Sequence, residues 1–270
     1  MLTHRPLPRL RFGAGALRDG SRALPAEVAV AISYNGSTQA VMMATPADLA
    51  DFARGFTLTE GIATLDEIES IEAVETPRGI DLQIWLAGAA ADRQAKRRRS
   101  MAGPVGCGLC GIDSLEEAMR VARPVPPSDF AMTPAQVMAA MAALPGHQPL
   151  HDATRAAHCA AFWTPEGIAL SREDVGRHNA LDKLIGALAA GAGQPQAGAV
   201  VLTCRTSVDM VQKACAAGFP ILIAVSAPTA AAVQMAEAAG LTLIALARPD
   251  GFELFTHPHR ITPEDKADVA

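Results

Sequence analysis

The second half of the chain alternates short apolar runs with amphipathic stretches. The apolar runs 199–204, 219–225 and 241–247 have the length and composition of buried strands. The stretches between them, 208–217 and 229–239, carry apolar residues at helical spacing. Alternation at this spacing predicts a largely parallel or mixed sheet that is covered by helices.

Further elements surround these units. A strand pair, 158–163 and 168–173, is expected on either side of the turn sequence TPEG, with a helix over 176–190 and a short last strand over 252–257. Ligands in such folds usually bind where the carboxyl ends of the strands meet. The loops expected at these ends follow Cys204, Val225 and Ala247.

The first half has a different pattern, with a hairpin as its clearest signal. Alternating residues at 27–34 and 38–45 flank Asn35-Gly36, the pair that favours a tight two-residue turn. Thr45-Pro46 then has the form of a helix N-cap followed by a first-turn proline, which predicts a helix over 47–59.

The remaining signals define the expected domains. A strand is predicted over 81–87 and helices over 89–100, from about residue 113, and over 134–144. We expect a loose tail over 1–25, an N-terminal α/β domain over 26–122, a proline-rich linker over 123–134 and a second domain over 135–270. The linker is predicted because four of its twelve residues are proline, which neither helices nor central strands tolerate.

Composition and charge exclude several classes of protein. The net charge of −5 argues against bulk electrostatic binding of nucleic acid. No apolar run reaches the length of a membrane span, and the N-terminus lacks the pattern of a signal peptide. Five cysteines form an odd set without a disulfide framework, so we expect a reducing cytoplasm.

The sequence GPVGCGLCG contains Cys107 and Cys110, which are separated by two residues and lie among four glycines, shortly after the basic run KRRRS. A thiolate is the reactive form of cysteine, and nearby cations, a following helix N-terminus and a second cysteine all lower the pKa of a thiol. Three interpretations remain open: half of a zinc site, a thioredoxin-like redox pair, or a carrier of a reactive sulfur atom. Zinc is disfavoured because no second CxxC exists. A zinc deaminase is excluded because no histidine has a glutamate two residues later.

The second half holds two further clusters at predicted helix starts. Glu173 to Lys183, EDVGRHNALDK, contains Arg177 and His178 where a helix N-terminus favours anions. Arg205, Thr206 and Ser207 follow a buried strand and suit phosphate or carboxylate binding. The later loops SAPT and ARPDG repeat this arrangement, so the three loops together could line one anionic ligand such as a nucleotide. Neither a Walker loop nor a G-x-G-x-x-G motif is present.

Together these blocks resemble the formate dehydrogenase accessory sulfurtransferases of the FdhD/NarQ type. The similar blocks are YNGSTQAVMMATPADLADFARGFTLTEGI, KRRRSMAGPVGCGLCG, EDVGRHNALDKLIG, RTSVDMVQKA, AVSAPTAAAV and THPHR. The resemblance implies a cytidine-deaminase-like C-terminal domain joined to a smaller N-terminal α/β domain, and a homodimer. It also implies transfer of persulfide sulfur from a cysteine desulfurase to the molybdenum (or tungsten) bis-guanine-dinucleotide cofactor, before insertion into formate dehydrogenase.

The resemblance assigns roles to residues. Cys107 would be the persulfide carrier and Cys110 its partner. The cofactor would be contacted by Leu246, Ala247, Arg248, Pro249, Asp250 and Gly251, with Arg205, Thr206, Ser207, His178 and Arg177 lining its pocket. No zinc is expected. The alternative from another class is a cofactor-binding chaperone without sulfur chemistry, whose cysteines form a redox pair. One departure is the stretch TRAAH, where Arg155 and Ala157 replace a glycine and a threonine that are usual in the family.

Overall fold

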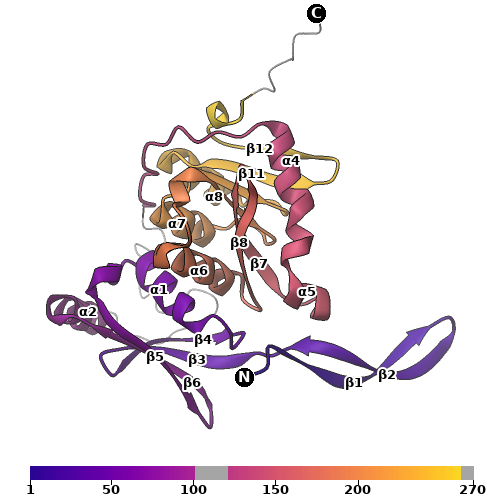
Figure 1. Ribbon diagram of the computed structural model, residues 1–270, viewed down its shortest axis with the longest axis horizontal. Coiled ribbons are helices and arrows are strands. Elements are labelled where there is room, and N and C mark those ends of the chain that lie inside the picture. The colour runs from indigo at the N-terminus through magenta and orange to yellow at the C-terminus, as the bar shows by residue number, and fades with distance from the viewer. Residues whose placement is uncertain (101–120, 263–270) are drawn as a thin grey trace, which may run out of the picture.

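The computed structural model describes residues 1–100 and 121–262 and has three sheets (Figure 1). The largest sheet has the order β12-β11-β10-β9-β7-β8. Its strands are β7 (His158–Thr164), β8 (Gly167–Asp174), β9 (Ala199–Leu202), β10 (Ile221–Ala224), β11 (Thr242–Arg248) and β12 (Gly251–Leu254). The central strands β9, β10 and β11 are parallel, and the pairs β7–β8, β7–β9 and β11–β12 are antiparallel. The predicted α/β class with a mixed sheet is confirmed.

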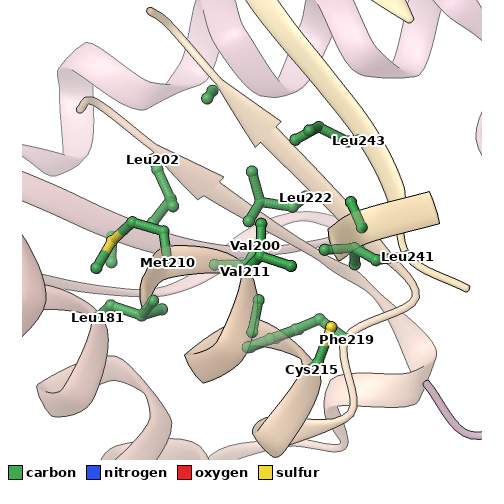
Figure 2. Packing of buried hydrophobic residues seen from close by; sticks show 14 of the residues in the cluster. Leu181, Val200, Leu202, Met210, Val211, Cys215, Phe219, Leu222, Leu241 and Leu243 are labelled. Atoms are coloured by element: carbon green, nitrogen blue, oxygen red, sulfur yellow. The ribbon is translucent and has the colours of Figure 1, made fainter. Parts of the chain in front are cut away.

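Helices cover both faces of this sheet because its central strands are apolar on both sides. Val200, Leu222 and Leu243 pack with α6 (Arg177–Ala187), α7 (Val208–Ala217) and α8 (Ala230–Ala239), as Figure 2 shows for part of this core. The alternate positions Val201 and Ile223 pack beneath α4 (Pro134–Ala143). Burial on both faces explains why these strands are continuous apolar runs rather than alternating ones.

The four-stranded sheet of the first half has the order β4-β3-β6-β5. Its strands are β3 (Val28–Tyr34), β4 (Ser37–Ala44), β5 (Ile68–Thr76) and β6 (Gly79–Leu86). Asn35 (φ 47°) and Gly36 (φ 75°) form the turn between β3 and β4, which confirms the predicted hairpin. Helices α1 (Leu49–Thr59) and α2 (Gly88–Ser100) lie on the sheet face that carries the buried residues Val30, Ile32 and Leu82.

The prediction of a loose tail over residues 1–25 is wrong. The segment forms a hairpin of β1 (His4–Gly13) and β2 (Ala16–Pro25), paired through ten residues on each strand. Ala14 (φ 49°) and Gly15 (φ 75°) supply the left-handed turn. Pro6 and Pro8 are tolerated because they are two residues apart, so that their missing N–H groups fall on the same edge of the ribbon. We call this hairpin, residues 4–25, the arm.

The predicted N-cap at Thr45 is also wrong, because α1 begins at Leu49 and Asp48 (φ 52°) precedes it. The backbone of Thr45 is engaged elsewhere. Its N–H donates to Asp174 at 2.9 Å, and its carbonyl accepts a hydrogen bond from Lys183 at 2.9 Å. The backbone of Thr45 therefore forms hydrogen bonds with the buried pair of Asp174 and Lys183 in the second half, and it does not cap α1.

Helices α1 and α6 cross at two glycines, one from each half of the chain. A Cβ atom on Gly55 would lie 1.7 Å from the carbonyl oxygen of Asp182. One on Gly186 would lie 1.9 Å from the carbonyl oxygen of Asp51. Neither position has room for a side chain, so the backbones of the two helices are in direct contact.

Two buried lysines also connect the halves. The Lys183 ammonium lies 2.6 Å from Asp174, and both side chains are fully buried. Lys213 lies 2.9 Å from Asp182 and 3.0 Å from Glu60. Burial alone would lower the pKa of Lys213, but the facing carboxylates outweigh it and raise this pKa above its usual value. The ion pair of Lys213 with Glu60 and the hydrogen bond from Lys183 to the carbonyl of Thr45 therefore cross the junction between the halves.

Two elements are absent from the expected pattern, β5 and a short helix near residue 150, and the helix expected from about residue 113 lies outside the described residues. Leu144–His147 form a 3₁₀ turn after α4, and the short helix α5 (Pro149–Thr154) follows it. Residues 123–131 carry neither helix nor strand, as their prolines predict. The division into domains at this stretch stays a prediction. No helix within residues 1–100 and 121–262 is both long enough and apolar enough to cross a membrane.

Candidate functional site

A cavity of about 740 Å³ lies at the carboxyl ends of the three parallel strands, against α4 and α5. The strand ends contribute Thr203, Val225 and Ala247, which follow β9, β10 and β11 in the manner expected for this fold class. The helical side contributes mostly apolar groups. The full lining consists of Met138, Met141, Ala142, Leu144, Pro145, Gln148, His151, Thr203, Val225, Ala247, Arg248 and Pro249.

The lining suits an apolar group that also carries a few polar atoms. Methionine, leucine, valine, alanine and proline residues form most of the wall. Gln148, His151, Thr203 and Arg248 supply a small number of hydrogen-bonding groups. Ligand pockets are commonly built in this way, with apolar walls for affinity and a few polar groups for orientation.

An irregularity at the end of β11 places two successive residues at the cavity. Leu246 has φ 51°, and the pairing of β11 with β12 shifts register between Ala245 and Arg248. Successive side chains of a regular strand point to opposite faces, whereas a bulge redirects them. Ala247 and Arg248 therefore both line the cavity. Asp250 and Gly251 complete the turn into β12 and are not among the lining residues.

The imidazole of His151 is held in one tautomer by its own backbone surroundings. Its Nδ1 lies 3.0 Å from the carbonyl oxygen of Ala157. A carbonyl oxygen can only accept, so Nδ1 carries the proton and a neutral ring presents its lone pair on Nε2. The carboxylate of Glu173 accepts 2.7 Å hydrogen bonds from the N–H groups of Leu150 and His151, which holds the start of α5. His151 is thus a positioned group in the wall of the cavity.

Arg177 and His178 begin α6 and lie outside the lining of this cavity. The Nε2 atom of His178 is 3.6 Å from Asp209, which is beyond hydrogen-bond distance, and the closeness of His178 is the main cause that lowers the pKa of the Asp209 carboxyl. His158 lies close enough to Arg177 and His178 for their electrostatic interaction to influence its pKa. Burial, together with the nearby positive charge of Arg177, lowers the pKa of His158 and favours its neutral form.

Arg205, Thr206 and Ser207 form the loop between β9 and α7, beside the SAPT loop. The Thr206 N–H donates to the carbonyl of Ala227, and the Thr229 N–H donates to the carbonyl of Thr206. Thr206 is fully buried, and its hydroxyl has no hydrogen-bond partner among the described residues. The structure therefore places the two predicted loops side by side, but separate from the residues that line the cavity.

The cysteines that the structure describes are poor candidates for sulfur chemistry. Cys159, Cys204 and Cys215 are buried and free. Burial raises the pKa of Cys159 and of Cys215 to about 12, and that of Cys204 to about 11. Thiols with such values stay protonated near neutral pH and do not act as nucleophiles. Cys159, Cys204 and Cys215 are therefore inert core residues.

Cys107 and Cys110 lie outside the described residues, so their assigned roles stay predictions. Within residues 1–100 and 121–262, no group of three or more His, Cys, Asp or Glu side chains has an arrangement that could hold a metal ion. The expectation of no zinc at the cysteine pair is not tested by this observation.

The departure at TRAAH falls at the end of α5. Arg155, which stands where the resemblance implies a glycine, has φ 58° in the left-handed region. Glycine adopts this conformation without strain and an arginine does not. The Arg155 side chain forms an exposed ion pair with Asp152 at 3.1 Å. The substitution thus changes a helix terminus two residues before Ala157, which holds His151.

Sequence reasoning missed the helical wall of the cavity. It assigned no role to Met138, Met141, Gln148 or His151. Met138 and Met141 are three residues apart on the predicted helix and could have been assigned to one face of it. Nothing local in the sequence distinguishes a methionine that lines a cavity from one that fills a core.

Comparisons with known proteins agree with this architecture. The model of the FdhD/NarQ family matches residues 25–262. The chain is 51% identical to the sulfur carrier protein FdhD of Agrobacterium fabrum over 261 residues, which cover 96% of each chain. It is 51% identical to the protein of the same name from Brucella abortus over 259 residues, 95% of this chain and 96% of that one.

The fold has also been observed in a solved structure. The crystal structure of a "putative formate dehydrogenase accessory protein" from Desulfotalea psychrophila superposes with a TM-score of 0.77. The match covers 97% of this chain and 100% of that one at 24% identity, so it supports the fold alone. The family model and the two relatives each cover most of the sequence. On this evidence the chain belongs to the FdhD/NarQ family.

Proposed function

We propose that this chain is a sulfur carrier for formate dehydrogenase, with Cys107 as the persulfide-bearing residue and Cys110 as its partner. The support is the name that its relatives carry, sulfur carrier protein, at about half identity over nearly the whole chain. The cavity at the strand ends would hold the recipient of the sulfur. That recipient is the molybdenum (or tungsten) bis-guanine-dinucleotide cofactor, which is a substrate here and not a resident group.

The sulfur transfer onto the carrier needs no external oxidant. The thiolate of Cys107 would attack the outer sulfur of a persulfide on a cysteine desulfurase. The new S–S bond forms as the old one breaks, and the donor cysteine leaves as a thiolate. This step requires a thiol of low pKa, which excludes the three buried cysteines because their pKa values are raised to about 11 or 12.

Intact-mass spectrometry after incubation with a cysteine desulfurase and cysteine tests this proposal. We expect a reducible gain of one sulfur atom on the wild type and on Cys204→Ala, and no gain on Cys107→Ala. Cys110→Ala shows whether the second cysteine is also needed for loading. A wild type that gains no sulfur, under conditions that load another acceptor, would leave a cofactor-binding chaperone without sulfur chemistry as the function.

The cavity predicts a second measurement, with guanosine diphosphate as a probe for the anionic end of the cofactor. Arg248 is the lining residue that carries a fixed positive charge. Arg248→Glu should weaken binding about 10- to 100-fold in calorimetry, because a hydrogen bond to a charged group contributes about 1.5–3 kcal/mol. Arg78→Glu makes the same charge change in the turn between β5 and β6 and should leave the affinity unchanged. If the wild type, Arg248→Glu and Arg78→Glu bound guanosine diphosphate with equal affinity, this cavity would not be the binding site.

A further inference from the structure

The first turns of helices α6 and α7 meet, and they bring a histidine and a carboxylate together. The Nε2 atom of His178 lies 3.6 Å from Oδ2 of Asp209, with the two side chains 18% and 25% exposed. The hydroxyl of Ser207, the N-cap residue of α7, donates to the same Oδ2 atom at 3.4 Å. We call His178 and Asp209 the dyad. None of these residues lines the cavity at the strand ends.

The carboxylate of Asp209 orients the imidazole of His178. The Nε2 atom is buried, faces this carboxylate and has no hydrogen bond within residues 1–100 and 121–262. A carboxylate oxygen accepts hydrogen bonds, so its closeness favours the tautomer with the proton on Nε2. A neutral ring then has its lone pair on Nδ1, which is not among the buried atoms without a partner. Histidines that transfer protons are commonly held in this way, with one ring nitrogen fixed by a carboxylate and the other free.

The dyad differs from the ion pairs that stabilise this fold. Lys183 and Asp174 lie 2.6 Å apart, and Lys213 lies 2.9 Å from Asp182, so both are hydrogen-bonded. The 3.6 Å between the atoms of the dyad is too long for a hydrogen bond. Buried polar atoms in native proteins nearly always have a partner, and an exception calls for an explanation such as a role in catalysis.

The charges around His178 favour an anion beside the dyad. Arg177 precedes it in α6 and has no hydrogen bond or ion pair within the two described ranges. On β7, burial and the charge of Arg177 lower the pKa of His158, which is therefore neutral. On β8, Asp174 is paired with Lys183. The charge of Arg177 thus has no counterion here, and the N-terminal ends of α6 and α7 add their partial positive charges. A thiolate near the dyad would be stabilised by both.

The length of the chain lets the cysteine pair reach the dyad. Val121, the first described residue after the segment 101–120, lines the same small hollow as Gln212. Gln212 lies about one helical turn after Asp209 on α7. Cys107 precedes Val121 by fourteen positions, and a chain of this length spans up to about 46 Å. The described chain therefore resumes close to the helix that carries Asp209, well within the reach of the Cys107 thiol.

We propose that His178 is the proton-transfer group of the sulfur carrier, with Asp209 as its positioning residue. This inference rests on the proposed function, because it requires a thiol that accepts sulfur. Nδ1 of His178 takes the proton of the Cys107 thiol, and the thiolate attacks the outer sulfur of the donor persulfide. The new bond from Cys107 to sulfur forms as the S–S bond of the donor breaks. The imidazolium then returns its proton to the departing donor thiolate, so the step needs no oxidant or reductant.

The rate of sulfur loading as a function of pH tests this role. A cysteine desulfurase that already carries a persulfide is mixed with each variant, the reaction is quenched, and intact-mass spectrometry gives the loaded fraction against time. A free thiol ionises by itself near about pH 8.5, so a base accelerates the reaction below this pH and not far above it.

We expect His178→Gln to load about 100-fold more slowly than the wild type at pH 7, which is within the usual effect of losing a general base. At about pH 10 its rate should approach that of the wild type, because the thiol is then ionised in both proteins. Asp209→Asn keeps the imidazole but loses the charge that orients it, so we expect a loss of about 10-fold at pH 7.

A second histidine and carboxylate supply matched controls. His257 lies 3.7 Å from Glu237, outside α6 and α7. His257→Gln and Glu237→Gln should load like the wild type at every pH. If His178→Gln were equally slow at all pH values, its effect would be structural and the assignment would be wrong. Free imidazole should raise the rate of His178→Ala at pH 7 without changing that of the wild type, and a lack of rescue would also count against the assignment.

Failure of the proposed function has a different result. A wild type that gains no sulfur at any pH would remove both the carrier role and the role of the dyad. If the wild type and His178→Gln loaded at the same rate at pH 7, sulfur transfer would stand and only the proton-transfer role would be lost.

Discussion

Replacing Lys183 with methionine should lower the free energy of unfolding by about 3–5 kcal/mol, which is the usual cost of removing one partner from a buried ion pair. Asp174 would remain fully buried with its charge and would keep only neutral donors, among them the N–H of Thr45. Urea unfolding followed by circular dichroism measures this change. A protein with a typical stability of about 5–15 kcal/mol would lose a large part of it.

The matched control for this prediction is an exposed ion pair. Arg155 lies 3.1 Å from Asp152 with both side chains more than half exposed, so Arg155→Met should cost less than about 1 kcal/mol. Adding Asp174→Asn to Lys183→Met should recover part of the loss, because it removes the charge that has no partner. A Lys183→Met protein no less stable than Arg155→Met would show that the pair is hydrated rather than buried.

Alanine at Gly186 should be nearly as damaging, although it adds one methyl group. The new Cβ would lie 1.9 Å from the carbonyl oxygen of Asp51, so α1 and α6 would have to separate. We expect a loss of about 3 kcal/mol, at the upper end of the cost of overpacking. Melting temperature and urea midpoint both report this loss.

The direction of the change in stability tests this second prediction. Alanine favours helices over glycine by about 1 kcal/mol, so a glycine with free space around it should gain stability on substitution. Gly88 at the start of α2 has no atom within 4 Å of the Cβ position, and Gly88→Ala should be neutral or stabilising. If Gly186→Ala behaved like Gly88→Ala, the close crossing of the two helices would be wrong.

The sequence was most informative where one local rule decides the structure. Asn35-Gly36 specified a hairpin because few other residues adopt two successive left-handed conformations. The helix over 208–217 and the three parallel strands were predictable because their periodicity reflects burial on known faces. The ends of those strands correctly indicated the loops that meet at one edge of the sheet.

Sequence reasoning failed where distant residues decide the structure. Thr45-Pro46 has the local pattern of a helix start, but the buried pair of Asp174 and Lys183 binds the backbone of Thr45. The sequence pattern does not predict the arm as a hairpin because neither of its faces is buried, so the alternation of apolar and polar residues that identifies a strand is weak there. The place of His151 at the cavity is not predictable from the local sequence, because it depends on hydrogen bonds that His151 donates to Ala157 and Glu173.

The crossing of α1 and α6 bears on how the chain folds during its synthesis. Helix α1 is complete at Thr59, but the glycine it packs against is Gly186, more than 120 residues later. Contacts between residues so far apart in sequence slow folding, because the loop between them must close before they contribute stability. The first half therefore leaves the ribosome with one side of α1 uncovered, until α6 has been made. Proteins with such long-range docking depend on chaperones, or on rapid completion of the chain, to avoid aggregation in this interval.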